Sequence, residues 1–187
     1  MLTEEERQYL LHVARRSIES VVNETSPVVI ETRSKSLMEP CGAFVTLRVG
    51  RGLRGCIGYI EPIKPLVETV QEVAAKAAIE DMRFTPVTPE ELSTIEIEIS
   101  VLSPLKEIHD PDELKVGEHG IIIEHGRYRG LLLPQVATEY GWDRETFLSQ
   151  GARKAGLPTD AWRDPETKIY VFTAEVFGEH SSALANS

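Results

Sequence analysis

The sequence predicts an α+β protein with a largely antiparallel sheet. Apolar and polar residues alternate in residues 43–49 and 95–101, which is typical of strands with one solvated face. Glycine-containing turns at residues 50–52 and 125–127 each join two strand-like stretches and predict β-hairpins. Helical patterns are interspersed among these hairpins and do not alternate strictly with single strands, so a parallel βαβ sheet is not expected.

The first predicted element is a helix that begins at Thr3 and ends before Pro27. Thr3 and Glu6 have the spacing of a capping box. Apolar residues then recur at helical spacing, at Leu10, Ala14, Ile18 and Val21.

The second element is a hairpin of residues 43–49 and 53–60. With residues 50–52 as its loop, Val49 pairs with Leu53, Thr46 lies opposite Cys56, and Arg48 lies opposite Arg54. This register predicts that Arg48, Arg54 and Cys56 share the polar face. It assigns the following residues to the core: Val45, Leu47, Val49, Leu53, Ile57 and Tyr59. Two glycines in the second strand, Gly55 and Gly58, indicate a bulge or the close approach of another backbone or of a ligand.

Residues 65–81 form the next predicted helix, which opens at Pro65 and carries apolar residues at helical spacing. Thr88 begins a short helix. The strand at residues 95–101 follows, and its core-facing residues are Ile95, Ile97, Ile99 and Val101.

The second half contains a hairpin of residues 121–124 and 128–133, which stops at Pro134. A helix capped by Asp143 runs from about Arg144 to Lys154, with Gly156 just beyond its end. A last strand is predicted over residues 168–177. The tail, residues 181–187, has little apolar surface to bury and is expected to be mobile.

Composition narrows the class of protein. The chain has 187 residues, 41% of them hydrophobic, which suffices for a sizeable core. A net charge of −10 argues against nucleic-acid binding, which requires a basic surface. There is no apolar run long enough to cross a membrane, and the acidic start is unlike a signal peptide. With two unpaired cysteines, the expected location is the cytoplasm.

The hexapeptide Leu-Arg-Gly-Cys-Ile-Gly at residues 53–58 is the strongest candidate for a functional site. An adjacent guanidinium such as that of Arg54 lowers the pKa of a thiol, so Cys56 has the ingredients of a nucleophile. The alternative is that Cys56 is a small buried apolar residue without chemistry. Cys41 lies about 17 Å from Cys56 in the hairpin register, too far for a disulfide, so both thiols are expected to be free.

Sequence patterns for cofactors are weak. Residues 50–55 spell Gly-x-Gly-x-x-Gly, but the chain continues as a strand where a dinucleotide site requires a helix. Neither a Cys-x-x-Cys nor a His-Glu-x-x-His pattern is present, so no metal site is predicted and any cofactor is unknown.

Five motifs occur together in order: Gly-Ala-Phe-Val-Thr-Leu at 42–47, the hexapeptide at 53–58, Asp-x-Arg-Phe-x-Pro at 81–86, Leu-Leu-Pro-Gln-Val at 132–136 and Lys-Ala-Gly-Leu at 154–157. In these motifs the chain resembles the AMMECR family, whose bacterial and archaeal members are often named as a component of the AmmeMemoRadiSam system. The resemblance covers residues 5–180 and implies one domain over residues 1–180 with two unequal lobes around a cleft. It implies neighbours encoding a Memo-like and a radical-SAM protein, and no established activity.

Where many relatives have Leu-Cys-x-Lys, this chain has Gly-Ala-Arg-Lys at residues 151–154. The second thiol is missing, which argues against a two-cysteine redox scheme.

The resemblance adds cleft candidates from the matching motifs: Asp81, Arg83, His119, Gln135 and Lys154. Each has a plainer interpretation. Asp81 and Arg83 form a helix-end ion pair, His119 is a hydrogen-bonded turn residue, Gln135 anchors backbone, and Lys154 is solvated.

Two functional hypotheses follow. In the first, the protein is an enzyme or enzyme subunit in which Cys56 attacks a small, anionic substrate in the cleft and Arg54 stabilises the charge. His119 is then the base, and backbone N–H groups of Gly55 or Gly58 stabilise an oxyanion. In the second, the hairpin at residues 53–58 binds a Memo-like or radical-SAM partner, with Arg48 and Arg54 supplying the contact charges. The oligomeric state is not predicted.

Overall fold

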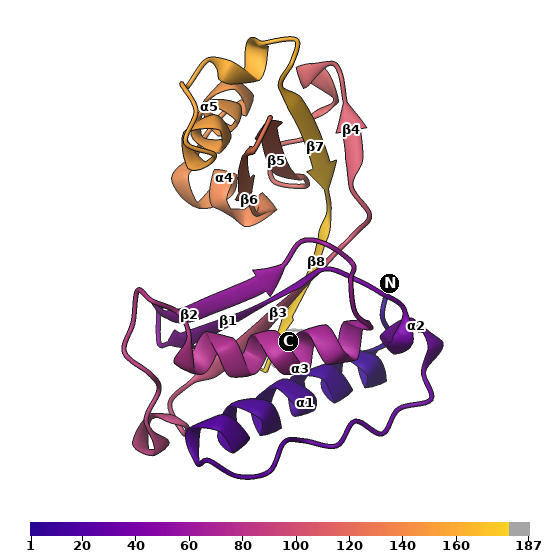
Figure 1. Cartoon of the computed structure of the whole chain (residues 1–187), viewed down its shortest axis with the longest axis vertical. Coiled ribbons are helices and arrows are strands. Elements are labelled where there is room, and N and C mark those ends of the chain that lie inside the picture. The colour runs from indigo at the N-terminus through magenta and orange to yellow at the C-terminus, as the bar shows by residue number, and fades with distance from the viewer. Residues whose placement is uncertain (180–187) are drawn as a thin grey trace, which may run out of the picture. The chain divides into compact units, whose positions relative to one another are not determined.

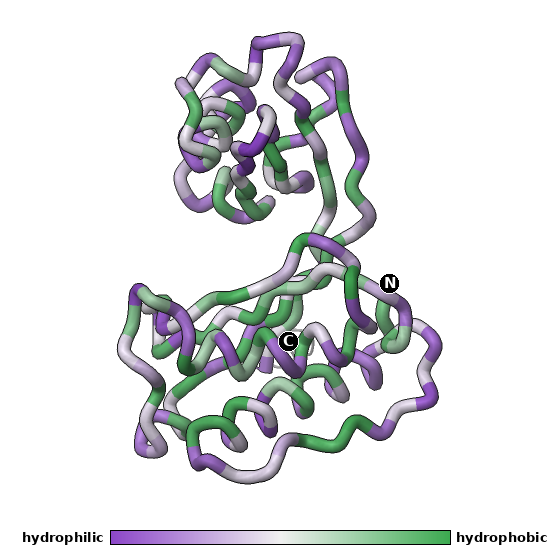
Figure 2. Tube along the Cα trace, in the orientation of Figure 1, coloured by the Kyte–Doolittle hydropathy of each residue, from purple (hydrophilic) through white to green (hydrophobic). Residues whose placement is uncertain are grey.

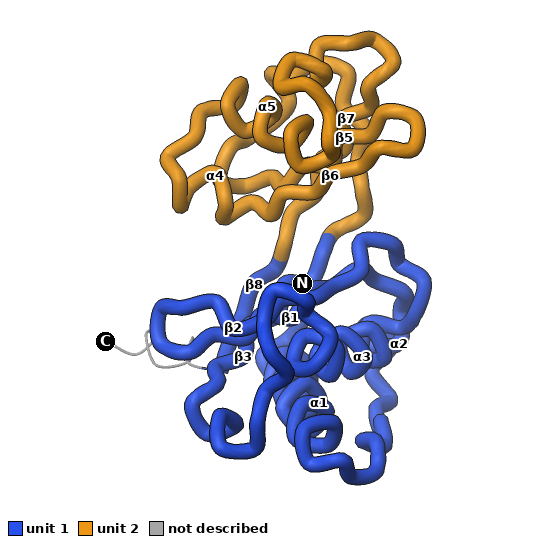
Figure 3. The backbone as a smooth tube through the Cα atoms, turned by 60° about the vertical axis from the view of Figure 1, so that its left-hand side comes forward, with its two compact units in different colours: residues 1–102, 175–187 blue, residues 103–174 orange. Residues whose placement is uncertain are grey.

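The computed structural model describes residues 1–179, and the predicted mobile tail lies outside them. The chain divides into two compact units (Figure 3). Among the described residues, unit 1 comprises residues 1–102 and 175–179, and unit 2 comprises Ser103–Ala174. The expected organisation as one domain with two lobes around a cleft stays a prediction, and each unit is described by itself.

Unit 1 is a four-stranded sheet with helices on one face (Figure 1). The strand order is β2 (Gly52–Tyr59), β1 (Ala43–Val49), β3 (Glu96–Leu102) and β8 (Ala174–Gly178). Helices α1 (Glu4–Val22) and α3 (Leu66–Ile79) pack against each other, and α3 lies against β1 and β2. Two short helical segments complete the unit, α2 (Lys35–Met38) and η1 (Pro89–Glu91).

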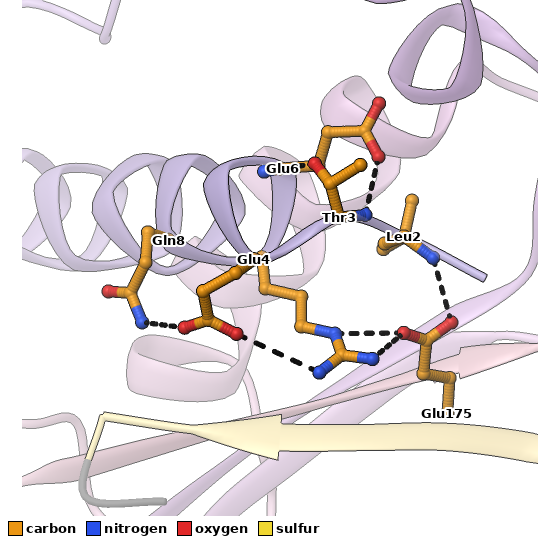
Figure 4. Close-up of polar contacts among 7 residues, drawn as sticks. Leu2, Thr3, Glu4, Glu6, Gln8 and Glu175 are labelled. Atoms are coloured by element: carbon orange, nitrogen blue, oxygen red, sulfur yellow. Dashed lines mark hydrogen bonds and ion pairs between the residues drawn. The ribbon is translucent and has the colours of Figure 1, made fainter. Parts of the chain in front are cut away.

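Helix α1 begins where the capping box predicts. The backbone N–H of Thr3 donates to Oε2 of Glu6, and the backbone N–H of Glu6 donates to the Thr3 hydroxyl (Figure 4). Arg7, in the next turn, forms an ion pair with Glu175 of β8, which ties the start of α1 to the edge of the sheet.

The core of unit 1 lies between the helices and one face of the sheet. Apolar and polar segments alternate along α1 in Figure 2, as expected of an amphipathic helix. In β3 the predicted core residues, including Ile97 and Ile99, are buried. The alternation of strand side chains therefore leaves the polar residues of β1 and β3 on the face away from the helices, which we call the open face.

The first hairpin is confirmed, and part of its register is corrected. Thr46 pairs with Cys56 as predicted, but Arg48 pairs with Leu53, and Arg54 is an extra, bulged residue. The loop is a two-residue turn of Gly50 and Arg51, which the φ of +57° at Gly50 permits. Between this turn and the bulge, each residue of β1 therefore pairs with a residue of β2 one position earlier than predicted.

The bulge also corrects two predicted core positions. Val49 is 41% exposed and Leu53 is 39% exposed, whereas Val45 and Leu47 are buried as predicted. Ile57 and Tyr59 are partly buried against the unit 1 core. The end of the hairpin therefore presents apolar side chains to solvent.

Unit 2 is a second four-stranded sheet, in the order β4 (Lys106–Ile108), β7 (Lys168–Phe172), β5 (Gly120–His125) and β6 (Tyr128–Leu132). Helices α4 (Pro134–Tyr140) and α5 (Arg144–Lys154) pack on β5, and α5 also packs on β6. Two 3₁₀ turns, η2 (Pro111–Glu113) and η3 (Ala161–Arg163), complete the unit.

The second half confirms the predicted hairpin and the helix capped by Asp143, whose side chain accepts from the N–H of Thr146. The prediction of a single strand over residues 168–177 is wrong. The strand is interrupted at Thr173, so that β7 belongs to the sheet of unit 2 and β8 to the sheet of unit 1. Pro134 ends β6 as predicted and then begins α4, a helix that the sequence pattern did not reveal.

All strand pairs with a resolved register are antiparallel, which confirms the predicted α+β fold with a largely antiparallel sheet. Among residues 1–179 no helix combines the length and the apolar character that crossing a membrane requires.

Candidate functional site

Cys56 lies near the middle of β2, at the edge of the unit 1 sheet. Thr46 pairs with Cys56 on one side and with Glu98 of β3 on the other. The Thr46 hydroxyl donates a hydrogen bond to Sγ of Cys56 over 3.3 Å. Cys56, Thr46 and Glu98 therefore form a row across three strands of the open face.

Asp81, just after α3, is hydrogen-bonded to the backbone of this edge strand. The N–H of Cys56 donates to Oδ2 of Asp81 over 2.8 Å, and Nη2 of Arg83 donates to the carbonyl of Cys56 over 3.4 Å. The side chain of Asp81 is 6% exposed. The two residues satisfy backbone groups that an edge strand otherwise leaves open to pairing with another chain.

The same carboxylate orients Arg83. Nε of Arg83 donates to Oδ1 of Asp81 over 3.0 Å and Nη2 donates to Oδ2 over 2.7 Å. The Arg83 side chain is 58% exposed, so its remaining donors face solvent beside Cys56. The Arg83 guanidinium holds the pKa of Asp81 well below its usual range, so the carboxylate stays charged.

Burial raises the pKa of the Cys56 thiol above its usual value. The hydrogen bond from Thr46 and the charge of Arg83 lower this pKa, while the charges of Asp81 and Glu98 raise it further. The thiol is therefore protonated at neutral pH, contrary to the expectation of a ready thiolate.

Arg54 does not supply the cation beside Cys56. Its guanidinium forms two hydrogen bonds with the Glu91 carboxylate, of 2.8 and 3.0 Å, and a third with the carbonyl of Thr85. The bulge takes Arg54 out of the predicted pairing with Arg48, whereas Arg48 and Cys56 share one face as predicted, because Cys56 pairs with Thr46, two residues before Arg48. Arg83 is the guanidinium that bonds to Cys56, and Arg48 pairs across the sheet with Glu96.

The glycines beside Cys56 are explained by close approach. A Cβ on Gly55 would lie 2.3 Å from the carbonyl oxygen of Ala77 in α3. A Cβ on Gly58 would lie 2.3 Å from the ring of Phe44, which packs over it on the open face. Both glycines are required by packing within unit 1, and their predicted oxyanion role stays a prediction.

Three candidates belong to unit 2. Nδ1 of His119 accepts a hydrogen bond from the N–H of Lys115, which fits the plainer interpretation as a turn residue. Gln135 lies in the first turn of α4, and Lys154 is the last residue of α5. Their participation in a site with Cys56 stays a prediction.

Sequence reasoning did not single out Glu98 as a site residue. Alternation in β3 places Glu96 and Glu98 on one face, but which strand pairs with β3 cannot be obtained from local patterns. Both cysteines are free, as predicted, with Cys41 donating to the carbonyl of Leu102. In the part of the chain that the structure describes, no three His, Cys, Asp or Glu side chains are grouped to hold a metal ion.

Comparisons with known proteins agree with the motifs. The sequence model of the AMMECR1 family matches residues 11–177. A protein of Thermococcus gammatolerans is 49% identical over 183 residues, which cover 92% of this chain and 89% of the relative. A protein of Methanothermobacter thermautotrophicus is 45% identical over 185 residues, which cover 95% and 96%. The crystal structure of the uncharacterized protein PH0010 from Pyrococcus horikoshii superimposes with a TM-score of 0.90 at 43% identity, covering 96% of this chain and 94% of that one.

Proposed function

The chain belongs to the AMMECR1 family, and we propose that its Cys56 site is the substrate site of a cysteine-dependent enzyme or enzyme subunit. In this proposal Arg83 binds an anionic group of a small substrate, and the Cys56 thiol reacts with the bound molecule. Arg83 thus has the role that the sequence analysis assigned to Arg54, which is to stabilise negative charge beside Cys56.

The observation that carries the proposal is the fixed orientation of Arg83. The guanidinium is held by the buried carboxylate of Asp81 and by the carbonyl of Cys56, and more than half of the Arg83 side chain remains exposed. A guanidinium that is oriented before binding loses less conformational entropy when it pairs with a carboxylate or phosphate. The arrangement suits the recognition of an anion close to Sγ of Cys56.

The proposed reaction starts from a protonated thiol, because burial raises the pKa of Cys56. Sγ forms a bond to an electrophilic carbon, the leaving group departs with its electron pair, and the thiol proton passes to that group or to solvent. A protonated thiol resists adventitious oxidation until a substrate is bound. His119 remains the predicted base.

Thiol reagents of different charge test the anion site. Methyl methanethiosulfonate is neutral, and its 2-sulfonatoethyl analogue is anionic. Each forms a mixed disulfide with Cys56 and releases methanesulfinate. We expect Arg83→Gln to lower the ratio of the anionic to the neutral rate about 1.4- to fivefold, the effect of a partly exposed charge pair of ~0.2–1 kcal/mol. Taking the ratio cancels changes in the thiolate fraction.

The matched control is Arg54→Gln, which removes the guanidinium that is bound to Glu91. This variant is expected to leave the rate ratio unchanged, and Cys41, followed in the same samples by mass spectrometry, is a second control. An Arg83→Gln ratio equal to that of the unsubstituted protein refutes the anion site.

A second candidate function is supported by the exposed end of the hairpin. Val49 and Leu53 present apolar side chains there, which suits a protein-interaction module binding a Memo-like or radical-SAM partner. Arg54 is engaged with Glu91, so the contact depends on these apolar residues. Titration of purified partners encoded nearby, with Leu53→Ser as the interface variant and Met82→Ser as an exposed control, decides whether this surface binds them.

A further inference from the structure

Glu98 stands apart from the other carboxylates around Cys56. It lies in β3 on the open face, in one row with Thr46 and Cys56. Its side chain is only partly exposed, yet it makes no hydrogen bond or ion pair with any residue that the structure describes. Its negative charge raises the pKa of the Cys56 thiol.

The neighbouring carboxylates are all engaged. Asp81 bonds to Arg83, Glu91 bonds to Arg54, and Glu96, which lies opposite Arg48 in the strand register, also has an interaction partner. A partly exposed carboxylate that has no protein partner keeps its full capacity to accept hydrogen bonds and to pair with a cation. Glu98 is therefore available to bind a cationic or donor group of a ligand.

Ser100 gives a second, independent indication on the same face. Its side chain follows Glu98 by two residues in β3, it is 1% exposed, and its Oγ atom has no hydrogen-bond partner among the described residues. Buried hydroxyl groups normally have a partner. The open face thus holds two polar side chains with unused hydrogen-bonding capacity, both on the β3 side of Cys56.

Charge is distributed asymmetrically around the thiol. Arg83 lies beyond the outer edge of β2, whereas Glu98 lies across β1 from Cys56. Two strand spacings separate Cys56 from Glu98, or about 10 Å between Cα atoms. A molecule that contacts both charged groups must extend past Sγ of Cys56.

We infer that the substrate is bifunctional: its anionic group binds Arg83, and a protonated amine or similar cationic donor binds Glu98. This inference rests on the proposed function, because it assigns the second end of the molecule that Cys56 attacks. Glu98 is then a specificity-determining residue that contacts the substrate. Molecules with an amine and a carboxylate separated by several methylene groups represent the class.

The first test uses the cationic 2-(trimethylammonium)ethyl methanethiosulfonate against the neutral methyl reagent. We expect Glu98→Gln to lower the ratio of cationic to neutral rates at Cys56 about threefold or more. The matched control is Glu96→Gln, which removes a carboxylate two residues away on the same face that, unlike Glu98, has an interaction partner. Equal effects of the two variants refute a specific role of Glu98.

The second test asks whether one molecule engages both groups. Glycine, 4-aminobutyrate and 6-aminohexanoate are compared for protection of Cys56 against the neutral reagent, with hexanoate and hexylamine as monofunctional references. We expect 6-aminohexanoate to protect at least about threefold better than either reference, and Glu98→Gln to abolish that advantage.

The outcomes separate this inference from the proposed function. If hexanoate protects as well as 6-aminohexanoate and protection is lost in Arg83→Gln, the anion site stands and the bifunctional substrate is refuted. If none of the compounds protects and the charge of the reagent does not matter, both the bifunctional substrate and the anion site are refuted.

Discussion

The backbone N–H of Cys56 donates a hydrogen bond of 2.8 Å to the carboxylate of Asp81, 25 residues further along the chain. This bond fastens the middle of an edge strand to the segment after α3. Because the same carboxylate binds Arg83, one buried side chain fixes both the thiol's strand and the nearest guanidinium. Loss of the Asp81 charge should therefore disturb both groups.

Replacing Asp81 by Asn is expected to destabilise the protein by about 2–3 kcal/mol, because a buried carboxylate that accepts four hydrogen bonds from backbone and guanidinium donors loses its charge. Urea unfolding of the variant at neutral pH measures the loss. Asp160→Asn is the control, since Asp160 is exposed and makes no side-chain cap. Equal unfolding midpoints for the two variants contradict the anchoring role of Asp81.

Acidification should weaken the ion pair between Glu91 and Arg54 of β2. The hydrogen bonds to Arg54 lower the pKa of Glu91 from 4.5 to about 2. A carboxyl whose folded pKa is depressed stabilises the fold above its unfolded pKa, and this stabilisation is lost as the pH falls through the folded value. The loss from Glu91 therefore lies between pH 4.5 and about 2.

Urea midpoints of the protein and of Glu91→Gln, measured across that window, check this dependence. The variant is expected to be less stable at neutral pH and to lose less stability on acidification. Glu90→Gln, at the exposed neighbouring position, should follow the unsubstituted protein. Parallel curves for the Glu91 variant and the unsubstituted protein would exclude the contribution.

The pH dependence of iodoacetamide labelling tests which arginine acts on Cys56. Burial raises the pKa of the thiol, so labelling should still be rising above about pH 8.5, the usual thiol value. Loss of a nearby positive charge destabilises the thiolate, so Arg83→Gln should move the curve to higher pH by roughly half a unit. Arg54→Gln should not move it, and a larger shift in that variant would restore the role first assigned to Arg54.

The sequence predicted most elements because their signals are local. The capping box at Thr3, the alternation of Ile97 and Ile99, and the cap at Asp143 each depend on residues within one or two turns. The pairing of Thr46 with Cys56 was also predicted, since a short turn restricts the register of a hairpin.

The errors arose where a single residue changes the geometry or where distant segments meet. The positive φ of Gly50 allows a shorter turn, and Arg54 becomes a bulged residue. The partner of Arg48 is therefore Leu53, where Arg54 was predicted. The unpaired state of Glu98 depends on β3 pairing with β1 across about 50 residues of chain, and no local pattern encodes that pairing.

Gly55→Ala should be strongly destabilising, because the new Cβ would meet the Ala77 carbonyl oxygen at 2.3 Å and backbone would have to move. We expect a cost of at least about 2 kcal/mol in urea unfolding. Gly52→Ala, in the same strand, is the matched control, since its Cβ would meet the nearest atom at 3.4 Å, an ordinary contact. Similar costs at both positions would mean that α3 does not press on β2 at Gly55.

Truncation of two leucines to alanine, Leu47 in β1 and Leu53 in β2, tests the corrected register. If Leu53 faced the core, as a three-residue turn requires, Leu53→Ala would cost as much as Leu47→Ala. Leu47 is fully buried, so its truncation should cost about 2–5 kcal/mol, whereas Leu53 is 39% exposed and its truncation should cost less than about 1 kcal/mol. Urea unfolding measures both. A large loss in Leu53→Ala would contradict the exposed hairpin end and, with it, the apolar contact proposed for a protein partner.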